Sequence, residues 1–403
     1  MTDFDHELNQ RLAAIRGQGL YRELRRIETP QSPRLEIAGR TFINFSSNDY
    51  LGLANEPALK AAAIKAIERY GAGSGASRLI CGSLAPHHEL EEALAAFKQT
   101  QAALTFSSGY AAAVGTLCAL FGRDDIIVLD KLVHACIVDA ARLSGAKLRV
   151  FAHNDLAALE KILQWADERN RKSKIENRQS RVLIVTESVF SMDGDHAPLR
   201  EMAGLKEKYG AWLMVDEAHA TGLYGPNRRG LVEELGVSER VEIQMGTLGK
   251  ALGAAGGCVC GSRSLIDFLI NRARSFIFST APVPAAAAAA RAAIEFVQSA
   301  GGETRRQTLW ARVGQLTSHL APRTPHLPSA ILPLIVGDEA KAVELAASLR
   351  ERGIFVPAIR YPTVARGKAR FRLTVTAAHT AEDIFELLAA LKTLDSDAQT
   401  CPT

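Results

Sequence analysis

Short runs of apolar residues recur along the middle of the chain, and amphipathic helical patterns separate most of them. The runs span residues 102–106, 125–129, 148–151, 182–186, 212–215 and 257–260. Strands that are apolar on both faces and alternate with helices are typical of a mostly parallel sheet covered by helices on both sides. The pattern therefore predicts a large α/β domain, in which ligands bind beyond the carboxyl ends of the strands.

The two ends of the chain have different patterns. Residues 5–26 place apolar residues at helical spacing among charges, residues 34–45 alternate as in a hairpin, and Pro57 opens a helix that reaches Tyr70. After about residue 300 the pattern predicts a helix, and then strands and helices in alternation. The predicted strands span 330–336 and 371–376, and the helices that follow them span 339–352 and 381–391. We predict an N-terminal segment (1–48), a large domain (49–295) and a small α+β C-terminal domain (296–403).

Composition and charge narrow the classes of protein. The 403 residues are 47% hydrophobic and 23% charged, and the net charge of +4 is scattered along the chain rather than gathered in a basic run, which argues against a nucleic-acid partner. The acidic, polar N-terminus is unlike a secretory signal, and the longest uncharged stretch (99–122) is mostly alanine, so no membrane span is predicted. A cytoplasmic enzyme fits these features.

Asp216, His219 and Lys250 are the candidate reactive residues. Asp216 directly follows the apolar run 212–215, and Lys250 lies within Gly-Thr-Leu-Gly-Lys-Ala-Leu-Gly (246–253), where small neighbours let a flat ring approach. Alone, such an aspartate would be read as a helix cap and such a lysine as a surface charge. Together they suit pyridoxal phosphate, because a carboxylate can keep its pyridine nitrogen protonated while a lysine bonds to its aldehyde.

A turn at Ser107-Ser108-Gly109 is a candidate phosphate site. It joins the predicted strand 102–106 to a helix, and backbone N–H groups at a helix N-terminus attract phosphate. A plain capped turn explains this segment equally well when it is taken alone.

Three competing motif matches lack their required context. Residues 71–76 match the dinucleotide pattern GxGxxA but follow a predicted helix instead of a strand. Asp216 to His219 spell the helicase signature DEAH, yet Gln244 and Ala251 break the phosphate loop that such ATPases need around Lys250. No further His or Cys stands at metal-ligand spacing from Asp216 and His219, so we predict no metal site.

Longer motifs resemble the α-oxoamine synthases, which are pyridoxal-phosphate acyltransferases of the aminotransferase-like fold (fold type I). In chain order the motifs are FSSNDYLGL (45–53), GSGASRLICG (73–82), SSGY (107–110), LVHAC (132–136), VFSMDGD (189–195), VDEAHATGLYG (215–225), GTLGKALG (246–253), FST (278–280) and AIRYPTVARGKARFRLTVTAAHT (358–380). The resemblance implies an α/β large domain with a mostly parallel seven-stranded sheet and a smaller α+β C-terminal domain.

The resemblance also implies roles for individual residues. Lys250 matches the lysine that binds the cofactor and acts as base, Asp216 the partner of the pyridine nitrogen, and His219 the donor to the phenolic oxygen. His134 matches an imidazole stacked on the ring, which completes the implied catalytic set. The further implied cofactor contacts are Gly109, Tyr110, Ser191, Thr247, Ser279 and Thr280.

Substrate contacts and partners follow from the same resemblance. Asn48 and Arg372 match positions that hold the amino-acid carboxylate, Thr363 matches a contact on the acyl side, and the implied substrate-binding set is Arg25, Asn48, His134, Thr363 and Arg372. Members of the family are homodimers with shared active sites, and Ser279 and Thr280 are expected to reach the phosphate of the neighbouring subunit.

Within the family, Arg360 ahead of Pro362-Thr363-Val364 resembles the members that join L-alanine to a pimeloyl thioester, carried by coenzyme A or an acyl carrier protein, in biotin biosynthesis. The alternative is a glycine-using member that makes 2-amino-3-ketobutyrate or 5-aminolevulinate.

Overall fold

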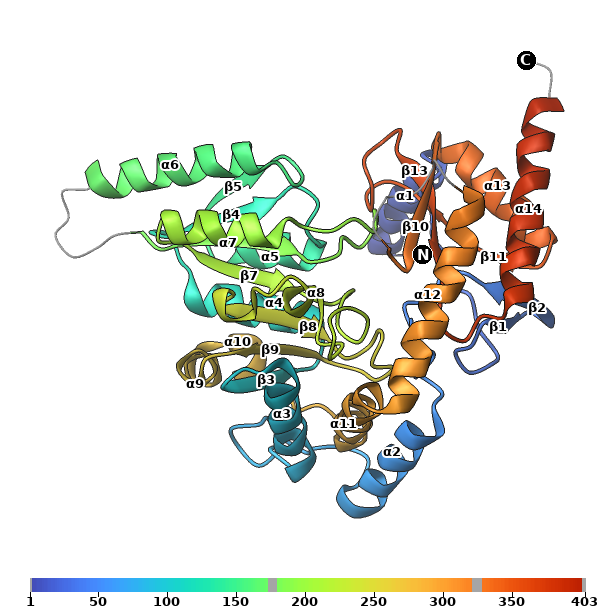
Figure 1. Cartoon of the computed structure of the whole chain (residues 1–403). Coiled ribbons are helices and arrows are strands. Elements are labelled where there is room, and N and C mark those ends of the chain that lie inside the picture. Colours follow the sequence, from blue (N-terminus) through green and yellow to red (C-terminus); the bar gives the residue numbers. More distant parts are fainter. Residues whose placement is uncertain (1, 173–179, 321–327, 401–403) are drawn as a thin grey trace. The chain divides into compact units, whose positions relative to one another are not determined.

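The computed structural model describes residues 2–172, 180–320 and 328–400, and Figure 1 shows them as ribbons. The chain forms two compact units. The larger unit comprises Asn48–Trp310, and the smaller unit combines Met1–Ser47 with Ala311–Thr403.

A seven-stranded sheet is the centre of the larger unit (Figure 1). Its strands are β3 (Ala102–Phe106), β4 (Ile126–Asp130), β5 (Lys147–Phe151), β6 (Val182–Glu187), β7 (Trp212–Asp216), β8 (Ile243–Thr247) and β9 (Gly257–Gly261). The spatial order is β3-β9-β8-β7-β6-β4-β5, and β9 runs opposite to the other six strands. The predicted mostly parallel sheet is therefore confirmed.

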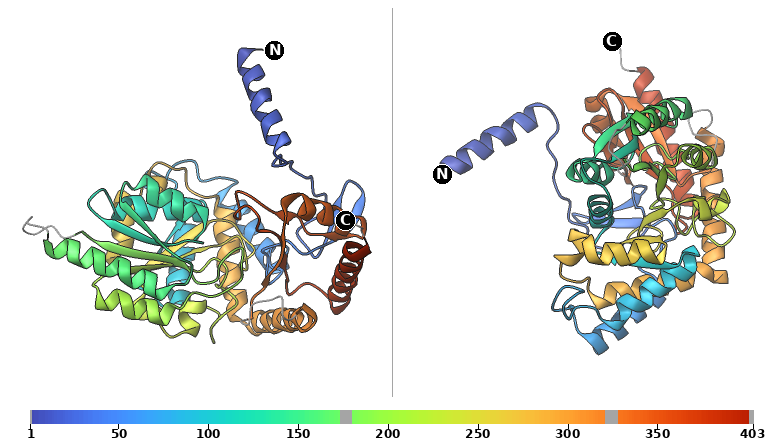
Figure 2. Two further views of the ribbon diagram at one scale, coloured as in Figure 1. Left: turned by 90° about the horizontal axis from the view of Figure 1, so that it is seen from above. Right: turned by 90° about the vertical axis from the view of Figure 1, so that its left-hand side faces the viewer.

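Helices cover both faces of this sheet, as Figure 2 shows for α4 and α5 on one side and α6 and α7 on the other. The helices of the larger unit are α2 (Pro57–Tyr70), α3 (Ala85–Lys98), α4 (Gly109–Leu120), α5 (Ala135–Leu143), α6 (Leu156–Lys172), α7 (Leu199–Lys208), α8 (Leu231–Glu234), η1 (Ser238–Arg240), α9 (Arg263–Arg272), α10 (Arg274–Ile277) and α11 (Pro284–Gln298). All six residues of β6 are buried, because Leu183 and Val185 pack into the core with α4 and α5 while the alternate residues face the other layer. Burial on both faces explains why the strands are continuous apolar runs in the sequence.

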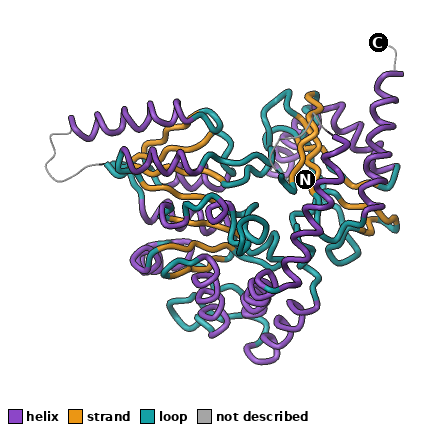
Figure 3. The backbone as a smooth tube through the Cα atoms, viewed as in Figure 1, coloured by secondary structure: helices purple, strands orange, loops and turns teal. Residues whose placement is uncertain are grey.

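The parallel strands end along one edge of the sheet, and loops follow them there (Figure 3). Asp130, Glu187, Asp216 and Thr247 are the last residues of β4, β6, β7 and β8. The topology therefore brings polar residues that are far apart in the sequence to one edge.

The smaller unit contains two three-stranded sheets, ordered β1-β2-β11 and β10-β13-β12. Its elements are α1 (Asp3–Gly17), β1 (Arg34–Ile37), β2 (Arg40–Asn44), β10 (Ile331–Gly337), α13 (Glu339–Glu351), β11 (Ile354–Phe355), β12 (Ala358–Ile359), β13 (Ala369–Thr374) and α14 (Ala381–Thr400). Helix α12 (Ala300–Leu320) begins in the larger unit and ends in the smaller one. No helix among the described residues is long and apolar enough to cross a membrane.

Several predicted elements differ in extent from those observed. The helix predicted for residues 5–26 ends at Gly17, and all residues of α1 are exposed. Gly17 and Gly19, the latter with φ +67°, favour this early end, because glycine is a poor helix former and adopts the left-handed conformation readily. The hairpin at residues 34–45 and the helix Pro57–Tyr70 are confirmed.

Candidate active site

The larger unit brings most of the predicted cofactor residues to the carboxyl edge of its sheet. Asp216 ends β7 and Thr247 ends β8, while Ser107 to Gly109 form the turn between β3 and α4. His134 is the N-cap of α5, which follows β4, and Ser191 lies in the loop after β6. This is the edge where an open α/β sheet binds its ligand.

A chain of polar contacts begins at Lys250. Its Nζ lies 2.7 Å from His219 Nε2, and His219 Nδ1 lies 2.6 Å from the hydroxyl of Tyr50. The Tyr50 hydroxyl in turn donates to Asn48 Oδ1 at 3.3 Å. One proton assignment satisfies all three contacts, with the Lys250 amine donating to Nε2 and a protonated Nδ1 donating to Tyr50. These contacts fix the imidazole of His219 from both sides, while Lys250 remains only half-buried.

Asp216 is buried near these contacts, with 5% of its surface exposed. Its Oδ1 accepts a hydrogen bond from the Ala218 amide at 2.9 Å. Burial raises the pKa of Asp216, while the nearby Lys250 ammonium and the Ala218 amide oppose that rise by favouring the carboxylate. A cationic ring nitrogen beside Asp216 would act in the same direction as Lys250.

Glu187 is a second buried carboxylate at this edge, directly across the strand ladder from Asp216. Burial first, and then the charge of Asp216, raise the pKa of Glu187 to about 8. The backbone amides of Ser191 and His134 donate to its carboxyl group, so Glu187 connects two loops that carry predicted cofactor residues.

The turn after β3 has the geometry of an anion site. Ser108 caps α4 by accepting the Ala111 amide at 3.1 Å. A Cβ built on Gly109 would lie 3.9 Å from Thr247 Cβ, so the end of β8 lies against the turn. Gly257 of β9 approaches the turn so closely that a Cβ there would lie 2.4 Å from the Ser108 carbonyl oxygen. These small residues leave the helix N-terminus accessible to a phosphate group.

Tyr110 and Thr247, predicted to lie beside the phosphate, both have defined partners. The exposed Tyr110 donates its hydroxyl hydrogen to Asp139 Oδ2 at 3.1 Å. Thr247 donates to the Gly256 carbonyl at 3.0 Å and accepts from the Gly249 amide at 3.3 Å, so its hydroxyl also orders the segment that leads to Lys250.

His134 remains accessible, with its Nδ1 accepting the Cys136 amide at 3.2 Å. Partial desolvation, followed by the Lys250 charge, lowers the pKa of His134. A neutral imidazole suits stacking on an electron-deficient ring, because it adds no positive charge beside it.

Ser279 and Thr280 lie on a different segment of the larger unit. Thr280 is exposed and forms an isolated antiparallel bridge with Ser77, and the Ser279 hydroxyl donates to the Thr280 carbonyl at 3.3 Å. The bridge fixes the conformation of the FST motif within one chain.

The other predicted substrate residues belong to the smaller unit. Arg372 of β13 is buried and donates from Nη1 to Thr374 Oγ1 at 3.0 Å. Thr363 is exposed, with its amide bonded to the Arg360 carbonyl, and the exposed Arg25 guanidinium lies 5.8 Å from the centre of the Phe355 ring.

The donor set of the larger unit fits pyridoxal phosphate. A buried carboxylate suits the pyridine nitrogen, the lysine amine suits the aldehyde, and the glycine-lined helix N-terminus suits the phosphate. Among the described residues, no group of three or more His, Cys, Asp or Glu side chains is arranged to hold a metal ion.

Tyr50 and Glu187 were missed by sequence reasoning. Tyr50 stands within the FSSNDYLGL motif, but nothing local distinguishes it from a core aromatic. Glu187 follows an apolar run as Asp216 does, and that shared signal could have identified it.

Comparison with known proteins gives a consistent result. Residues 40–391 match the family model "Aminotransferase class I and II". The chain is 49% identical over 383 residues to an 8-amino-7-oxononanoate synthase of Anaeromyxobacter dehalogenans, covering 94% of this chain and 93% of the relative. These matches confirm the resemblance that the motifs indicated.

Solved structures agree with the fold. A serine palmitoyltransferase from S. paucimobilis, with a bound pyridoxal phosphate–myriocin adduct, superposes with a TM-score of 0.89 at 29% identity and covers 98% of both chains. An 8-amino-7-oxononanoate synthase from Francisella tularensis superposes with a TM-score of 0.73 at 28% identity, over 89% of this chain and 99% of that one.

Proposed function

The chain belongs to the aminotransferase class I and II family, and we propose that it condenses L-alanine with a pimeloyl thioester to form 8-amino-7-oxononanoate for biotin biosynthesis. The reaction releases CO2 and a free thiol, and pyridoxal 5'-phosphate is the cofactor. The observation that carries the proposal is the amine of Lys250, held 2.7 Å from His219 next to the buried Asp216. The names of the curated relatives support the choice of substrates.

When bound, pyridoxal phosphate supplies a protonated ring that stabilises negative charge at the α-carbon of an attached amino acid. Asp216 would hold the ring nitrogen, and His134 would cover one ring face. His219 would donate from Nε2 to the phenolic oxygen once Lys250 is attached to the cofactor, in the tautomer whose Nδ1 accepts from the Tyr50 hydroxyl. The turn at Gly109 and Tyr110 would bind the phosphate together with Thr247, and Ser191 would add a further contact.

Lys250 has two duties in the reaction. Its Nζ is the point of attachment for the cofactor, and the same atom, once free, removes the α-proton of alanine. His219 keeps the amine oriented, because Tyr50 holds the opposite ring nitrogen at 2.6 Å. The buried setting of Asp216 keeps water from competing for its carboxylate.

Arg372 and Asn48 hold the carboxylate of the amino acid, Arg372 by a charge-assisted pair of hydrogen bonds. Thr363 and Arg25 lie on the acyl side. The enzyme is a cytoplasmic homodimer in which Ser279 and Thr280 contact the phosphate of the neighbouring subunit.

Product analysis with a panel of substrates tests the proposal. Alanine and glycine are each offered with pimeloyl, succinyl and acetyl thioesters of coenzyme A and of an acyl carrier protein, and the amino ketone is identified by mass spectrometry. Alanine with a pimeloyl thioester should react fastest, and Lys250→Ala should form no product. Faster reaction of glycine with the acetyl or succinyl donor would instead assign a glycine-using enzyme, and turnover in the Lys250 variant would refute the lysine's role.

A further inference from the structure

His153 lies in the larger unit between two carboxylates that the proposed function does not use. Its Nδ1 is 3.0 Å from Asp130 Oδ1, and its Nε2 is 2.6 Å from Asp195 Oδ2. Asp130 is the last residue of β4, His153 follows β5, and Asp195 lies in the loop after β6. Three neighbouring strand ends are therefore joined through one imidazole.

The surrounding residues fix the orientation of the ring. Phe190 packs edge-on against it, with ring centres 4.3 Å apart and planes at 89°. Asn154 donates its backbone N–H to Asp130 Oδ2 at 2.8 Å, and its side-chain Nδ2 donates to Asp195 Oδ2 at 3.1 Å. Asn154 thus joins the same two aspartates as its neighbour His153.

Asp130 accepts hydrogen bonds from the segment that leads to His134. Its Oδ1 accepts the Leu132 amide at 2.8 Å, and its carbonyl oxygen accepts the Val133 amide at 3.3 Å. These bonds form a tight turn directly after β4, and His134 follows as the N-cap of α5. A shift of Asp130 would therefore move His134.

Asp195 is hydrogen-bonded to the loop that carries Ser191. The Phe190 amide bonds to the Asp195 carbonyl at 2.9 Å, and Val189 forms a bridge with His196. Ser191 lies inside this small hairpin. Since Glu187 accepts amides from both Ser191 and His134, the two loops are joined at a second point by a different carboxylate.

The charges favour a protonated imidazole. Desolvation lowers the pKa of His153, but the hydrogen bonds to Asp130 and Asp195 outweigh it and raise the pKa to about 10. An imidazolium donates through both nitrogens, which a neutral ring cannot do. Each aspartate then accepts one ring N–H.

We propose that His153 is a positioning residue, which aligns the His134 and Ser191 loops by donating to Asp130 and Asp195 at once. The proposal rests on the proposed function in one respect, namely that His134 and Ser191 contact the cofactor. The bonds between the loops and the imidazole do not depend on which substrates the enzyme uses.

Hydrogen–deuterium exchange of the cofactor-loaded enzyme tests the positioning directly, without substrate. The imidazole donates from two nitrogens that face different carboxylates, whereas both N–H groups of a glutamine side chain lie on one nitrogen, and its oxygen repels a carboxylate. In His153→Gln, exchange should therefore rise about tenfold in residues 131–137 and 189–196, and not elsewhere. The dissociation constant for pyridoxal phosphate should rise by a similar factor. His153→Arg, whose planar cation can donate in two directions, should recover part of both losses.

His88→Gln is the matched control, because the exposed His88 contacts the Ser83 hydroxyl and, among the residues that the structure describes, no carboxylate. It should change neither readout. Nitrogen-15 NMR should show both ring nitrogens of His153 protonated at pH 8. A neutral ring at that pH, unchanged exchange in the two loops, or a uniform rise across the larger unit would each overturn the proposal, whatever reaction the enzyme catalyses.

Discussion

At the scale of single residues, Tyr50 shows how the site depends on a side chain that does no chemistry. It is fully buried, and its hydroxyl lies between His219 Nδ1 and Asn48 Oδ1. A buried polar atom that loses its partner costs about 1–3 kcal/mol. The orientation of His219, and through it that of Lys250, therefore depends on a phenol.

Tyr50→Phe keeps the packing and removes that hydroxyl. We expect exchange of the α-proton of alanine to slow by about tenfold, because His219 loses the contact that holds its Nδ1. The rate is measured by proton NMR in D2O. Tyr209→Phe is the control, since the Tyr209 hydroxyl bonds to Glu160 on a partly exposed surface. Equal rates in the two variants would contradict this role for Tyr50.

Sequence reasoning identified residues that stand in motifs and missed those defined by contacts. Asp216, His219 and Lys250 were predicted to act together, and the structure places all three at one strand edge. The roles of His153 and Tyr50 depend on residues 42 and 169 positions away, respectively. Such pairings arise only when the sheet order is known, so local spacing could not indicate them.

At the scale of elements, the strands were predictable because they are buried on both faces. Strand β3 was predicted with the observed bounds, and β4, β5, β6, β7 and β9 to within one residue at each end. Strand β8 (Ile243–Thr247) was not predicted, because Gln244 and Gly246 interrupt its apolar pattern. Strands β11 and β12 have two residues each, too few for any period to be recognised.

A substitution at Gly257 tests the packing of β9 against the turn at residues 107–109, where we propose that the phosphate binds. A Cβ there would lie 2.4 Å from the Ser108 carbonyl oxygen and 2.5 Å from the Gly109 amide nitrogen, both backbone atoms that cannot rotate away. Gly257→Ala should therefore displace the turn and weaken binding of pyridoxal phosphate by at least about tenfold, as measured by fluorescence titration.

Gly204→Ala provides the matched control for this substitution. Gly204 lies inside α7, and a Cβ there would have no neighbour within 4 Å. The change should stabilise the helix by about 0.5–1 kcal/mol and leave cofactor binding as it is. If both variants bound the cofactor like the parent enzyme, the close approach at Gly257 would have no part in forming the site.

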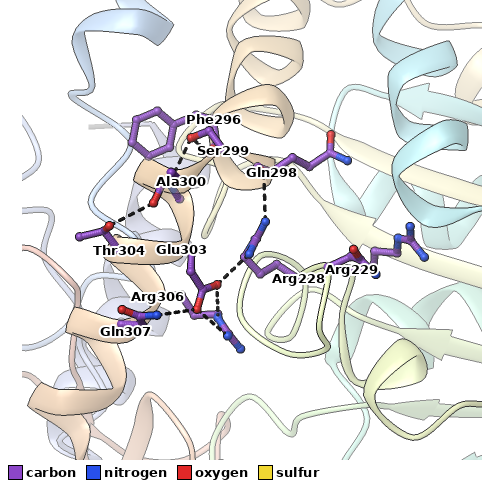
Figure 4. A network of polar contacts seen from close by, with 12 residues as sticks. Arg228, Arg229, Phe296, Gln298, Ser299, Ala300, Glu303, Thr304, Arg306 and Gln307 are labelled. Atoms are coloured by element: carbon purple, nitrogen blue, oxygen red, sulfur yellow. Dashed lines mark hydrogen bonds and ion pairs between the residues drawn. The ribbon is translucent and has the colours of Figure 1, made fainter.

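A network of charges holds the first turn of α12 to the loop after the DEAH segment (Figure 4). Arg228 donates to Glu303 at 2.7 Å and to the Gln298 carbonyl at 3.1 Å, and Glu303 also accepts from Arg306 and Gln307. The bond to Arg306, followed by that to Arg228, lowers the pKa of Glu303 to about 2.

Acid titration of stability tests this network. The pKa of Glu303 is lower when folded than its unfolded value of about 4.3, so its stabilisation is complete above pH 4.3 and is lost as the pH falls toward 2. Glu303→Gln should thus lower the Tm at pH 7, and the difference from the parent should shrink below about pH 4. Glu295→Gln, which breaks an exposed pair with Arg291, should change the Tm little at either pH. A pH-independent difference for Glu303→Gln would contradict the role of its charge.

At the scale of the whole molecule, the predicted roles divide between two units of one chain. The cofactor residues from Gly109 to Thr280 belong to the larger unit, and Arg25, Thr363 and Arg372 belong to the smaller one. The chain passes from the smaller unit to the larger one in the loop at Ser47 and Asn48, and it returns within helix α12, which contributes residues to both units. The sequence indicated a change of pattern near residue 300, but a continuous helix carries no signal for the point at which one unit gives way to the other.

The proposed homodimer with shared active sites leads to a quantitative prediction at this scale. Lys250→Ala removes the residue that we propose as attachment point and base of its own subunit's site. The double variant Ser279→Ala, Thr280→Ala removes the contacts that we propose to the neighbour's phosphate. In a hybrid dimer of the two variants, one site carries both defects and the other carries neither. Random reassembly of an equal mixture makes about half of the dimers hybrid, so activity should return to about one quarter of the parent value.

Each variant assayed alone should be nearly inactive, and mass spectrometry of the mixture confirms that hybrids have formed. If Ser279 and Thr280 acted on the phosphate of their own subunit, every hybrid would contain one site without the lysine and one without the hydroxyls, and mixing would restore nothing. The recovered fraction therefore decides whether the exposed segment at Thr280, fixed by its bridge to Ser77, completes its own site or that of a second copy of the chain.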